Sequence, residues 1–132
     1  MTLEATVLGS DAVRATSDGY EVDLHLAWYR SLPLSCVEDL GISIAGREAP
    51  RDRIRVLRDG EEFRLDELRE RVDDWWFVQD PLTVRVPDPA PLARGAEAEV
   101  SVRLATRIPY IIIGPDKALV QQTRVSGKVE IQ

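Results

Sequence analysis

The fold class is decided by one alternating stretch, Tyr20-Glu21-Val22-Asp23-Leu24-His25-Leu26-Ala27-Trp28. Every even-numbered position in it is apolar, and three of the four odd-numbered positions are polar. This period of two is typical of a β-strand that has one face on a core and the other face on water. The stretch therefore predicts a half-buried strand of an antiparallel sheet.

The same period recurs along the rest of the chain. It is carried by Leu3/Ala5/Val7, Ile42/Ile44, Ile54/Val56, Phe63/Leu65, Leu82/Val84/Val86, Val100/Val102/Leu104, Val120 and residues 125–131. Asp59-Gly60 is a strong signal for a hairpin turn. We therefore predict a single all-β domain spanning residues 1–132, an antiparallel β-sandwich (jelly-roll or immunoglobulin-like) of about eight to ten short strands.

Two segments interrupt the strand pattern. Residues 66–72 predict one short helix, because Asp66 can cap its start and Arg69 and Arg71 suit its end. The prolines of residues 87–91 predict a stiff, extended loop, since each fixes its own φ and restricts the residue before it. We expect this loop to cross one end of the sandwich.

Composition limits the possible partners and compartment. The net charge of −6 argues against nucleic acid as a partner. A single cysteine, Cys36, cannot form an internal disulfide, which fits a reducing cytoplasm. The chain has neither a visible signal peptide nor an apolar run long enough to cross a bilayer. We expect a cytoplasmic protein that binds neither nucleic acid nor a membrane.

The sequence offers no set of catalytic or metal-binding residues. Ser35 and Cys36 lack a second histidine that could activate them as nucleophiles. The sole histidine, His25, shares a strand face with Glu21 and Asp23, but the three spread along about 13 Å and charged residues are normal on a solvated face. We predict no catalytic residue, metal or cofactor in this chain.

Features suited to recognition are stronger. Residues 29–35 follow the alternating strand and include Tyr29, Arg30, Leu32, Pro33, Leu34 and Ser35. The same residue types, arginine, proline and tyrosine, recur near the end of the chain as Arg107, Pro109 and Tyr110. The two groups could meet at one end of the sandwich and form a binding surface. Alternatively, each arginine makes an ordinary surface ion pair.

A third recognition feature is the aromatic run of residues 75–77. Neighbouring residues on a strand point to opposite faces, so at least one ring of Trp75, Trp76 and Phe77 must point away from the core. Outward rings are used by sugar sites and protein interfaces. The alternative is that this ring lies under the proline loop at residues 87–91.

Together these residues resemble the small β-subunit of the bacterial C-glycoside deglycosidases. The resemblance rests on Tyr29-Arg30-x-Leu32-Pro33-Leu34-Ser35 after an alternating strand, a glycine-containing hairpin, Asp66-Glu67-Leu68 before Trp75-Trp76, and Arg107-x-x-Tyr110. These features span residues 20–113. The chain departs from the family pattern at residues 88–95, where the family usually has a glycine-rich stretch, and from Gly114 onward.

The resemblance implies a role in a two-subunit carbon–carbon lyase that acts on 3-oxo-C-glycosides. It implies a larger α-subunit, a TIM barrel that holds a divalent metal, often manganese, and supplies the catalytic base. The β-subunit would pack on this barrel and support it. It would be an enzyme only as part of the complex, with Tyr29, Arg30, Leu32, Pro33, Leu34, Ser35, Trp75, Trp76, Arg107 and Tyr110 at the interface or near the substrate.

Two other functions remain open on the residues alone. One is a free-standing carbohydrate-binding sandwich that uses Trp75 and Trp76 as a stacking platform. The other is a structural homo-oligomer.

Overall fold

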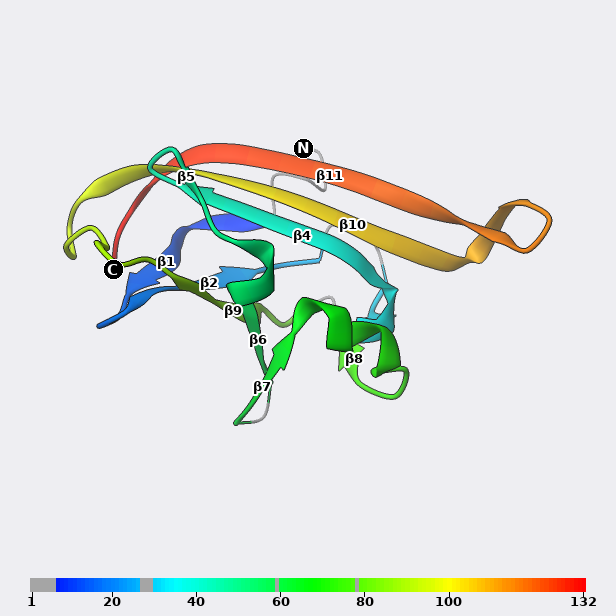
Figure 1. The fold of residues 1–132 in the computed structure, drawn as a ribbon. Helices are drawn as coiled ribbons and strands as arrows, with labels where there is room; N and C mark the ends of the chain where they lie inside the picture. The colour runs from blue at the N-terminus through cyan, green and yellow to red at the C-terminus, as the bar shows by residue number, and fades with distance from the viewer. Residues whose placement is uncertain (1–6, 27–29, 59, 78) are drawn as a thin grey trace.

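The computed structural model describes residues 7–26, 30–58, 60–77 and 79–132. In this part of the chain, two antiparallel sheets pack on each other, and a small two-stranded sheet closes one end (Figure 1). This arrangement confirms the predicted all-β, sandwich-like fold. Leu3 and Ala5 of the expected opening strand lie outside the described residues, as do Ala27, Trp28 and Tyr29.

The first sheet has five strands in the order β1-β2-β9-β6-β7. They are β1 (Leu8–Ala15), β2 (Gly19–Leu24), β9 (Leu82–Pro87), β6 (Arg55–Arg58) and β7 (Glu61–Arg64). Strand β1 was not predicted. Its pairing with β2 is irregular between Leu8 and Val13, which removes the regular alternation that would reveal a strand in the sequence.

The second sheet has four strands in the order β11-β10-β4-β5. They are β11 (Lys117–Glu130), β10 (Glu97–Gly114), β4 (Val37–Ile44) and β5 (Arg47–Glu48). Strands β10 and β11, of 18 and 14 residues, are much longer than the short strands expected from the sequence. They form a hairpin that extends beyond the rest of the sandwich (Figure 1).

The small sheet pairs β3 (Leu32–Pro33) with β8 (Trp75–Trp76). Three short 3-10 helices, η2 (Leu34–Cys36), η3 (Arg51–Arg53) and η4 (Leu65–Glu70), connect the strands. The helix expected at residues 66–72 is therefore η4, which is a 3-10 helix capped by Arg64 and not by Asp66. No helix in the described ranges has both the length and the apolar content that a membrane crossing requires.

The core consists of the apolar positions of both alternating sheets. Val22, Val84 and Val56 lie opposite one another across three paired strands of the first sheet and are completely buried. Ile42 and Val102 do the same in the second sheet. The apolar alternation thus fixes which face of each strand meets the other sheet, as the sequence predicts.

Candidate functional site

Two of the three recognition segments of the sequence, the described part of residues 29–35 and the aromatic run of residues 75–77, lie side by side at one end of the sandwich. Leu32 pairs with Trp76, and Pro33 pairs with Trp75. The backbone N–H of Leu34 then donates to the carbonyl of Asp74 at 2.7 Å. The segment after β2 and the aromatic run are therefore joined by backbone hydrogen bonds, although each was identified separately in the sequence.

Four of the nine described site candidates face the protein's own core. Leu34, Trp76 and Leu32 are at most 3% exposed, and Ser35 is also buried. The indole N–H of Trp76 donates to the carbonyl of Asp80 at 3.1 Å, which satisfies its polar atom inside the protein. These side chains anchor the end of the sandwich and hold their neighbours at its surface.

The arginine and tyrosine clusters meet, as the sequence suggested they could. The Arg30 guanidinium lies over the Tyr110 ring, with its carbon 5.5 Å from the ring centroid. This is the geometry of a cation–π contact. Both side chains are exposed, Tyr110 by 50%. Tyr29, the neighbour of Arg30, lies outside the described residues.

Arg107 is turned toward its own sheet. It is half-buried and forms an ion pair with Glu38, with 3.6 Å between its Nη1 atom and the carboxylate Oε1. Its Nη2 atom lies 4.0 Å from the sulfur of Cys36. The ordinary ion pair considered for this arginine is therefore present, and its guanidinium links β10 to the start of β4.

The outward rings of the aromatic run are Trp75 and Phe77, which are 43% and 50% exposed. The proline loop at residues 87–91 begins at the far end of β9. There the hydroxyl of Tyr20 accepts a hydrogen bond from the N–H of Leu92 at 2.6 Å. The loop therefore covers the Tyr20 end of the sandwich, as expected for a loop that crosses one end.

Three exposed residues at the tip of the β10–β11 hairpin complete this surface and were not identified from the sequence. Ile112, Ile113 and Val120 are 63%, 59% and 38% exposed. A signal was available in the run Ile111-Ile112-Ile113, because three consecutive apolar residues on a strand cannot all face one core.

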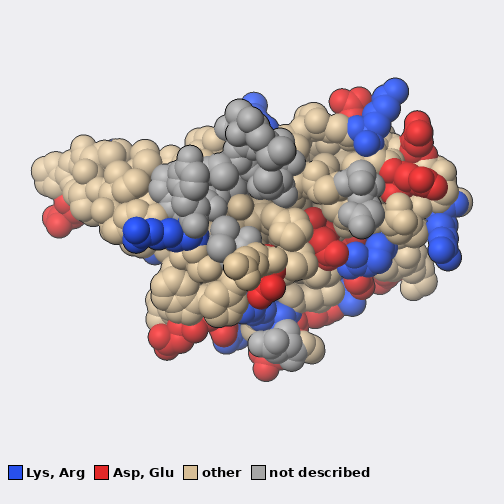
Figure 2. All heavy atoms as spheres, turned by 180° about the vertical axis from the view of Figure 1, so that it is seen from behind, with Lys and Arg blue, Asp and Glu red and all other residues tan. Residues whose placement is uncertain are grey.

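The exposed large hydrophobic side chains of the described residues come from two segments only. They are Val72, Trp75 and Phe77 in the first segment, and Tyr110, Ile112, Ile113 and Val120 in the second. We call these seven residues the apolar end. Figure 2 shows the projecting hairpin as largely uncharged, whereas charged side chains gather over the opposite end of the molecule.

Two other chemically reactive or charged side chains of the described residues, Cys36 and Asp23, are buried or held by internal contacts. Cys36 is buried, as expected for a small hydrophobic residue. Asp23 accepts hydrogen bonds from Arg14 at 2.7 and 3.1 Å and from the Thr83 hydroxyl at 2.7 Å. The hydrogen bond from Arg14 holds the pKa of the Asp23 carboxyl below its ordinary value. In the described ranges, no group of three or more histidine, cysteine or acidic residues is placed to hold a metal ion.

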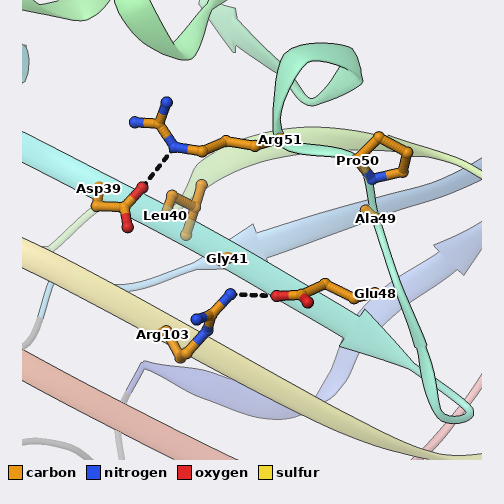
Figure 3. A pocket seen from close by; sticks show the side chains of 8 residues that line it. All are labelled: Asp39, Leu40, Gly41, Glu48, Ala49, Pro50, Arg51 and Arg103. Atoms are coloured by element: carbon orange, nitrogen blue, oxygen red, sulfur yellow. Dashed lines mark hydrogen bonds and ion pairs between the residues drawn. The ribbon is translucent and has the colours of Figure 1, made fainter.

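A groove of about 320 Å³ lies on the outer face of β4 (Figure 3). Its walls carry two ion pairs, Arg51 with Asp39 at 2.6 Å and Arg103 with Glu48. The hydrogen bond from Arg51 keeps the pKa of the Asp39 carboxyl below its usual range. Because each of these charges already has a partner and all four side chains are more than half exposed, the groove has the chemistry of an ordinary surface.

Comparison with known proteins identifies the family. The model of the family described as C-glycoside deglycosidase beta subunit matches residues 3–110. This chain belongs to that family. The resemblance seen in the sequence is thereby confirmed.

Individual members of the C-glycoside deglycosidase β-subunit family align over most of their length. A protein of that name from Microbacterium trichothecenolyticum is 38% identical over 117 residues, which cover 89% of this chain and 84% of the relative. A 3'-dehydrocarminate deglycosidase beta subunit from a Microbacterium species is 38% identical over 105 residues, or 80% and 78% of the two chains. Another β-subunit, from Arthrobacter globiformis, is 36% identical over 118 residues, or 89% of each chain.

The residues that match the family model include only part of the apolar end. The match includes Trp75, Phe77 and Tyr110, and it stops where the exposed isoleucines begin. The name β-subunit implies a partner subunit in a heteromeric complex, and the apolar end is the surface of this chain best suited to contact one.

Proposed function

We propose that this chain is the accessory β-subunit of a heteromeric C-glycoside deglycosidase, a carbon–carbon lyase that acts on 3-oxo-C-glycosides. Its partner is a metal-dependent TIM-barrel α-subunit, and the apolar end packs on that subunit. The observation that carries this proposal is that, among the residues the structure describes, the exposed large hydrophobic ones lie in segments 72–77 and 110–120. Such a patch on a family member whose relatives are named β-subunits is best explained as a subunit contact.

The chemistry of the substrate explains the division of labour between the subunits. In a 3-oxo-glycoside, the keto group acidifies the C–H bond at C2, and a general base can remove that proton. The electron pair of that C–H bond then forms a C1–C2 double bond as the bond from C1 to the aglycone breaks. The aglycone carbon keeps the electron pair of the broken bond and takes up a proton, so the free aglycone carries a C–H bond where it was joined to C1. The base and the divalent metal belong to the partner in this proposal. This chain contributes assembly and the positioning of elements near the mouth of the site.

The arrangement of the described residues agrees with a supporting role. The hydroxyl of Ser35 and the thiol of Cys36 are buried, so neither can reach a glycoside. Arg30 and Tyr110, by contrast, combine a positive charge, a ring and a hydroxyl at the surface. They are the best candidates on this chain to meet acidic groups or the substrate at a subunit boundary.

The test is reconstitution with the α-subunit of the same host. The two chains are co-expressed, one of them tagged, and release of free aglycone from a 3-oxo-C-glycoside is followed by chromatography. We expect co-purification, and turnover that falls sharply when this chain is omitted. An α-subunit that reaches full activity alone and does not retain this chain would contradict the proposal.

A free-standing carbohydrate-binding module is the second candidate, because Trp75 exposes 43% of its surface beside Phe77. It predicts that the isolated chain binds glycosides with dissociation constants of about 10 μM to 1 mM. Quenching of tryptophan fluorescence by glycosides, and its loss in Trp75→Phe, would support this function. An isolated chain that shows no quenching would exclude it.

A further inference from the structure

A small pocket lies at the end of the sandwich opposite the apolar end. It has a volume of about 150 Å³ and is lined by residues 47–50 and 86–89, together with Tyr20 and Ile44. Tyr20, Ile44 and Val86 are at most 3% exposed. Figure 1 shows β5, which begins the segment 47–50, and the end of the β10–β11 hairpin at opposite ends of the molecule. We call this hollow the Tyr20 pocket.

The lining of the Tyr20 pocket is largely apolar. Pro50, Pro87 and Pro89 add three rigid rings to the buried side chains. An apolar cavity of about 150 Å³ is large enough to hold a benzene ring. A sugar ring, by contrast, would leave most of its hydroxyl groups without partners against such walls. Size and lining therefore favour a ligand that presents one aromatic ring.

One charged side chain, Asp88, lines the pocket and is only 8% exposed. Its Oδ1 atom accepts a hydrogen bond from the N–H of Ala90 at 2.8 Å and lies 3.2 Å from the Nη1 atom of Arg47. Its Oδ2 atom accepts no hydrogen bond from the described residues, and it is not one of their fully buried polar atoms, so it keeps contact with solvent. This oxygen can accept a hydrogen bond from an O–H or N–H group of a ligand.

The ion pair between Arg47 and Asp88 limits the charge of that ligand. Because Arg47 already compensates the carboxylate, a cationic ligand would place a second positive charge beside the guanidinium. An anionic ligand would be repelled by Asp88 itself. A neutral O–H donor is therefore favoured. A phenol combines this donor with an aromatic ring, and its hydrogen bond to a carboxylate is charge-assisted and strong.

We propose that the Tyr20 pocket binds a phenol ring, whose hydroxyl donates a hydrogen bond to Oδ2 of Asp88 while the prolines and the buried side chains enclose the ring. The pocket is formed before a ligand enters. The N–H of Leu92 donates to the Tyr20 hydroxyl at 2.6 Å, and Nη2 of Arg47 donates to the carbonyl of Ala90 at 3.0 Å. Such preorganisation lowers the free-energy cost of binding. The site includes no residue of the apolar end and goes beyond the proposed function.

The test titrates the full chain with 4-methylphenol and with two matched probes that lack the O–H donor, toluene and 4-methylanisole. Backbone amide chemical shifts of isotope-labelled protein report where each probe binds. We expect saturable shifts at Ala90 and Leu92, with a dissociation constant of about 0.1–1 mM for 4-methylphenol. The two probes without an O–H group should bind at least about tenfold more weakly.

Asp88→Asn tests the hydrogen bond while sparing the loop contact, because the amide oxygen can still accept from the N–H of Ala90. The amide nitrogen that replaces Oδ2 donates to the oxygen of a phenol and to that of an ether alike. We expect the preference for 4-methylphenol over 4-methylanisole to fall below about threefold in this variant. An unchanged preference would show that Asp88 does not contact the ligand.

A second variant fills the pocket and leaves Asp88 in place. Ala49 lines the pocket, so Ala49→Leu places a larger side chain there, and Ala118→Leu, at a half-buried position of β11, is the matched control. Thermal unfolding verifies that both variants fold. We expect Ala49→Leu to weaken binding of 4-methylphenol at least about tenfold, and Ala118→Leu to change it less than about twofold.

The ring can belong to a free phenol or to a tyrosine side chain of another protein. N-acetyltyrosinamide separates the two sources: binding that is tighter than that of 4-methylphenol assigns the pocket to a tyrosine, and weaker binding assigns it to a free phenol. Either result retains the phenol ring as the ligand. The proposal would be overturned by the absence of saturable shifts at Ala90 and Leu92, by shifts confined to the apolar end, or by toluene that binds as tightly as 4-methylphenol. Because the titration uses this chain alone, its outcome leaves the proposed function untouched.

Discussion

The guanidinium carbon of Arg30 lies 5.5 Å from the centroid of the Tyr110 ring. This contact links the segment that follows β2 to the outer part of β10, two parts of the chain that are far apart in sequence. Because both residues are exposed, the contact contributes only about 0.5–1 kcal/mol to the fold. Because the contact lies at the apolar end, we expect it to matter more for binding the partner subunit than for the free energy of unfolding.

Replacement of Arg30 tests whether this residue contributes more to binding than to stability. We expect Arg30→Ala to lower the free energy of unfolding by less than about 1 kcal/mol, yet to weaken binding to the α-subunit by about tenfold or more. Arg30→Lys retains the positive charge without the flat guanidinium. Its affinity for the α-subunit should therefore lie between those of the wild type and Arg30→Ala. Arg94→Ala, in the exposed loop at the other end of the sandwich, is the control and should match the wild type. Normal co-purification and turnover of Arg30→Ala would show that Arg30 has no part in assembly.

The adjacent tryptophans should behave in opposite ways. Trp76 is 1% exposed, so Trp76→Ala leaves a cavity and should cost about 3–5 kcal/mol of stability. Trp75 is 43% exposed, so Trp75→Ala should cost less than about 1 kcal/mol. Urea unfolding of both variants measures the difference. Similar losses from the two substitutions would mean that the assignment of one ring to the core and the other to the surface is wrong.

Gly19 is required by a close backbone approach at the start of β2. A Cβ atom at this position would lie 2.1 Å from the carbonyl oxygen of Val86, on the paired strand β9. Backbone atoms on a central strand cannot easily move aside, so we expect Gly19→Ala to destabilise the protein by at least about 2 kcal/mol. Gly127→Ala is the matched control, because a Cβ atom there meets nothing within 4 Å. Thermal unfolding compares the two, and an unchanged midpoint for Gly19→Ala would contradict the pairing of β2 with β9 in this register.

Asp23 should contribute to stability in a pH-dependent way. Hydrogen bonds from Arg14 and Thr83 lower the pKa of its carboxyl in the folded state below the unfolded value of about 3.9. The ionised form is therefore favoured by folding, and its contribution is present above that value and lost as the pH falls through the lower, folded pKa.

The matching experiment measures urea unfolding of wild type and Asp23→Asn at pH 7 and pH 3. At pH 7 we expect the variant to be less stable by about 1 kcal/mol, because Arg14 loses its charged partner. The gap between the two proteins should shrink at pH 3, because this pH lies below the unfolded pKa of about 3.9 and the unfolded carboxyl then takes up a proton, so ionisation favours folding less. A gap that stays constant or widens toward low pH would show that this ion pair does not stabilise the folded state.

Much of the fold could be predicted from local sequence. The alternation at residues 20–26 and the apolar pairs of β4, β9 and β10 correctly assigned the residues that face the core. Strand β1 escaped prediction because its irregular pairing disturbs the period of two. The helix expected at residues 66–72 is the 3-10 helix η4, Leu65–Glu70, which buries Leu65 and Leu68.

The candidate site was harder to predict. Leu32, Leu34 and Trp76 were selected as surface candidates, and they are buried because β3 and β8 pair with each other and close the end of the sandwich. The run of residues 111–113 indicated that not all three isoleucines could face one core, but only the structure shows that Ile112 and Ile113 are the exposed ones, beyond the point where β10 stops pairing with β4. Exposure there depends on the length of β4, which ends its pairing at Thr106.

The sequence by itself determined that this chain is all-β, which face of its regular strands meets the core and to which family it belongs, since side-chain alternation and motif spacing are local properties of the chain. Only the tertiary structure decided that Arg30 meets Tyr110 and that Ile112 and Ile113 stay exposed near the end of β10. The physical reason is that strand partners and the points at which pairing stops are set by registers between distant segments. Those registers gather the exposed apolar residues at one end of the sandwich.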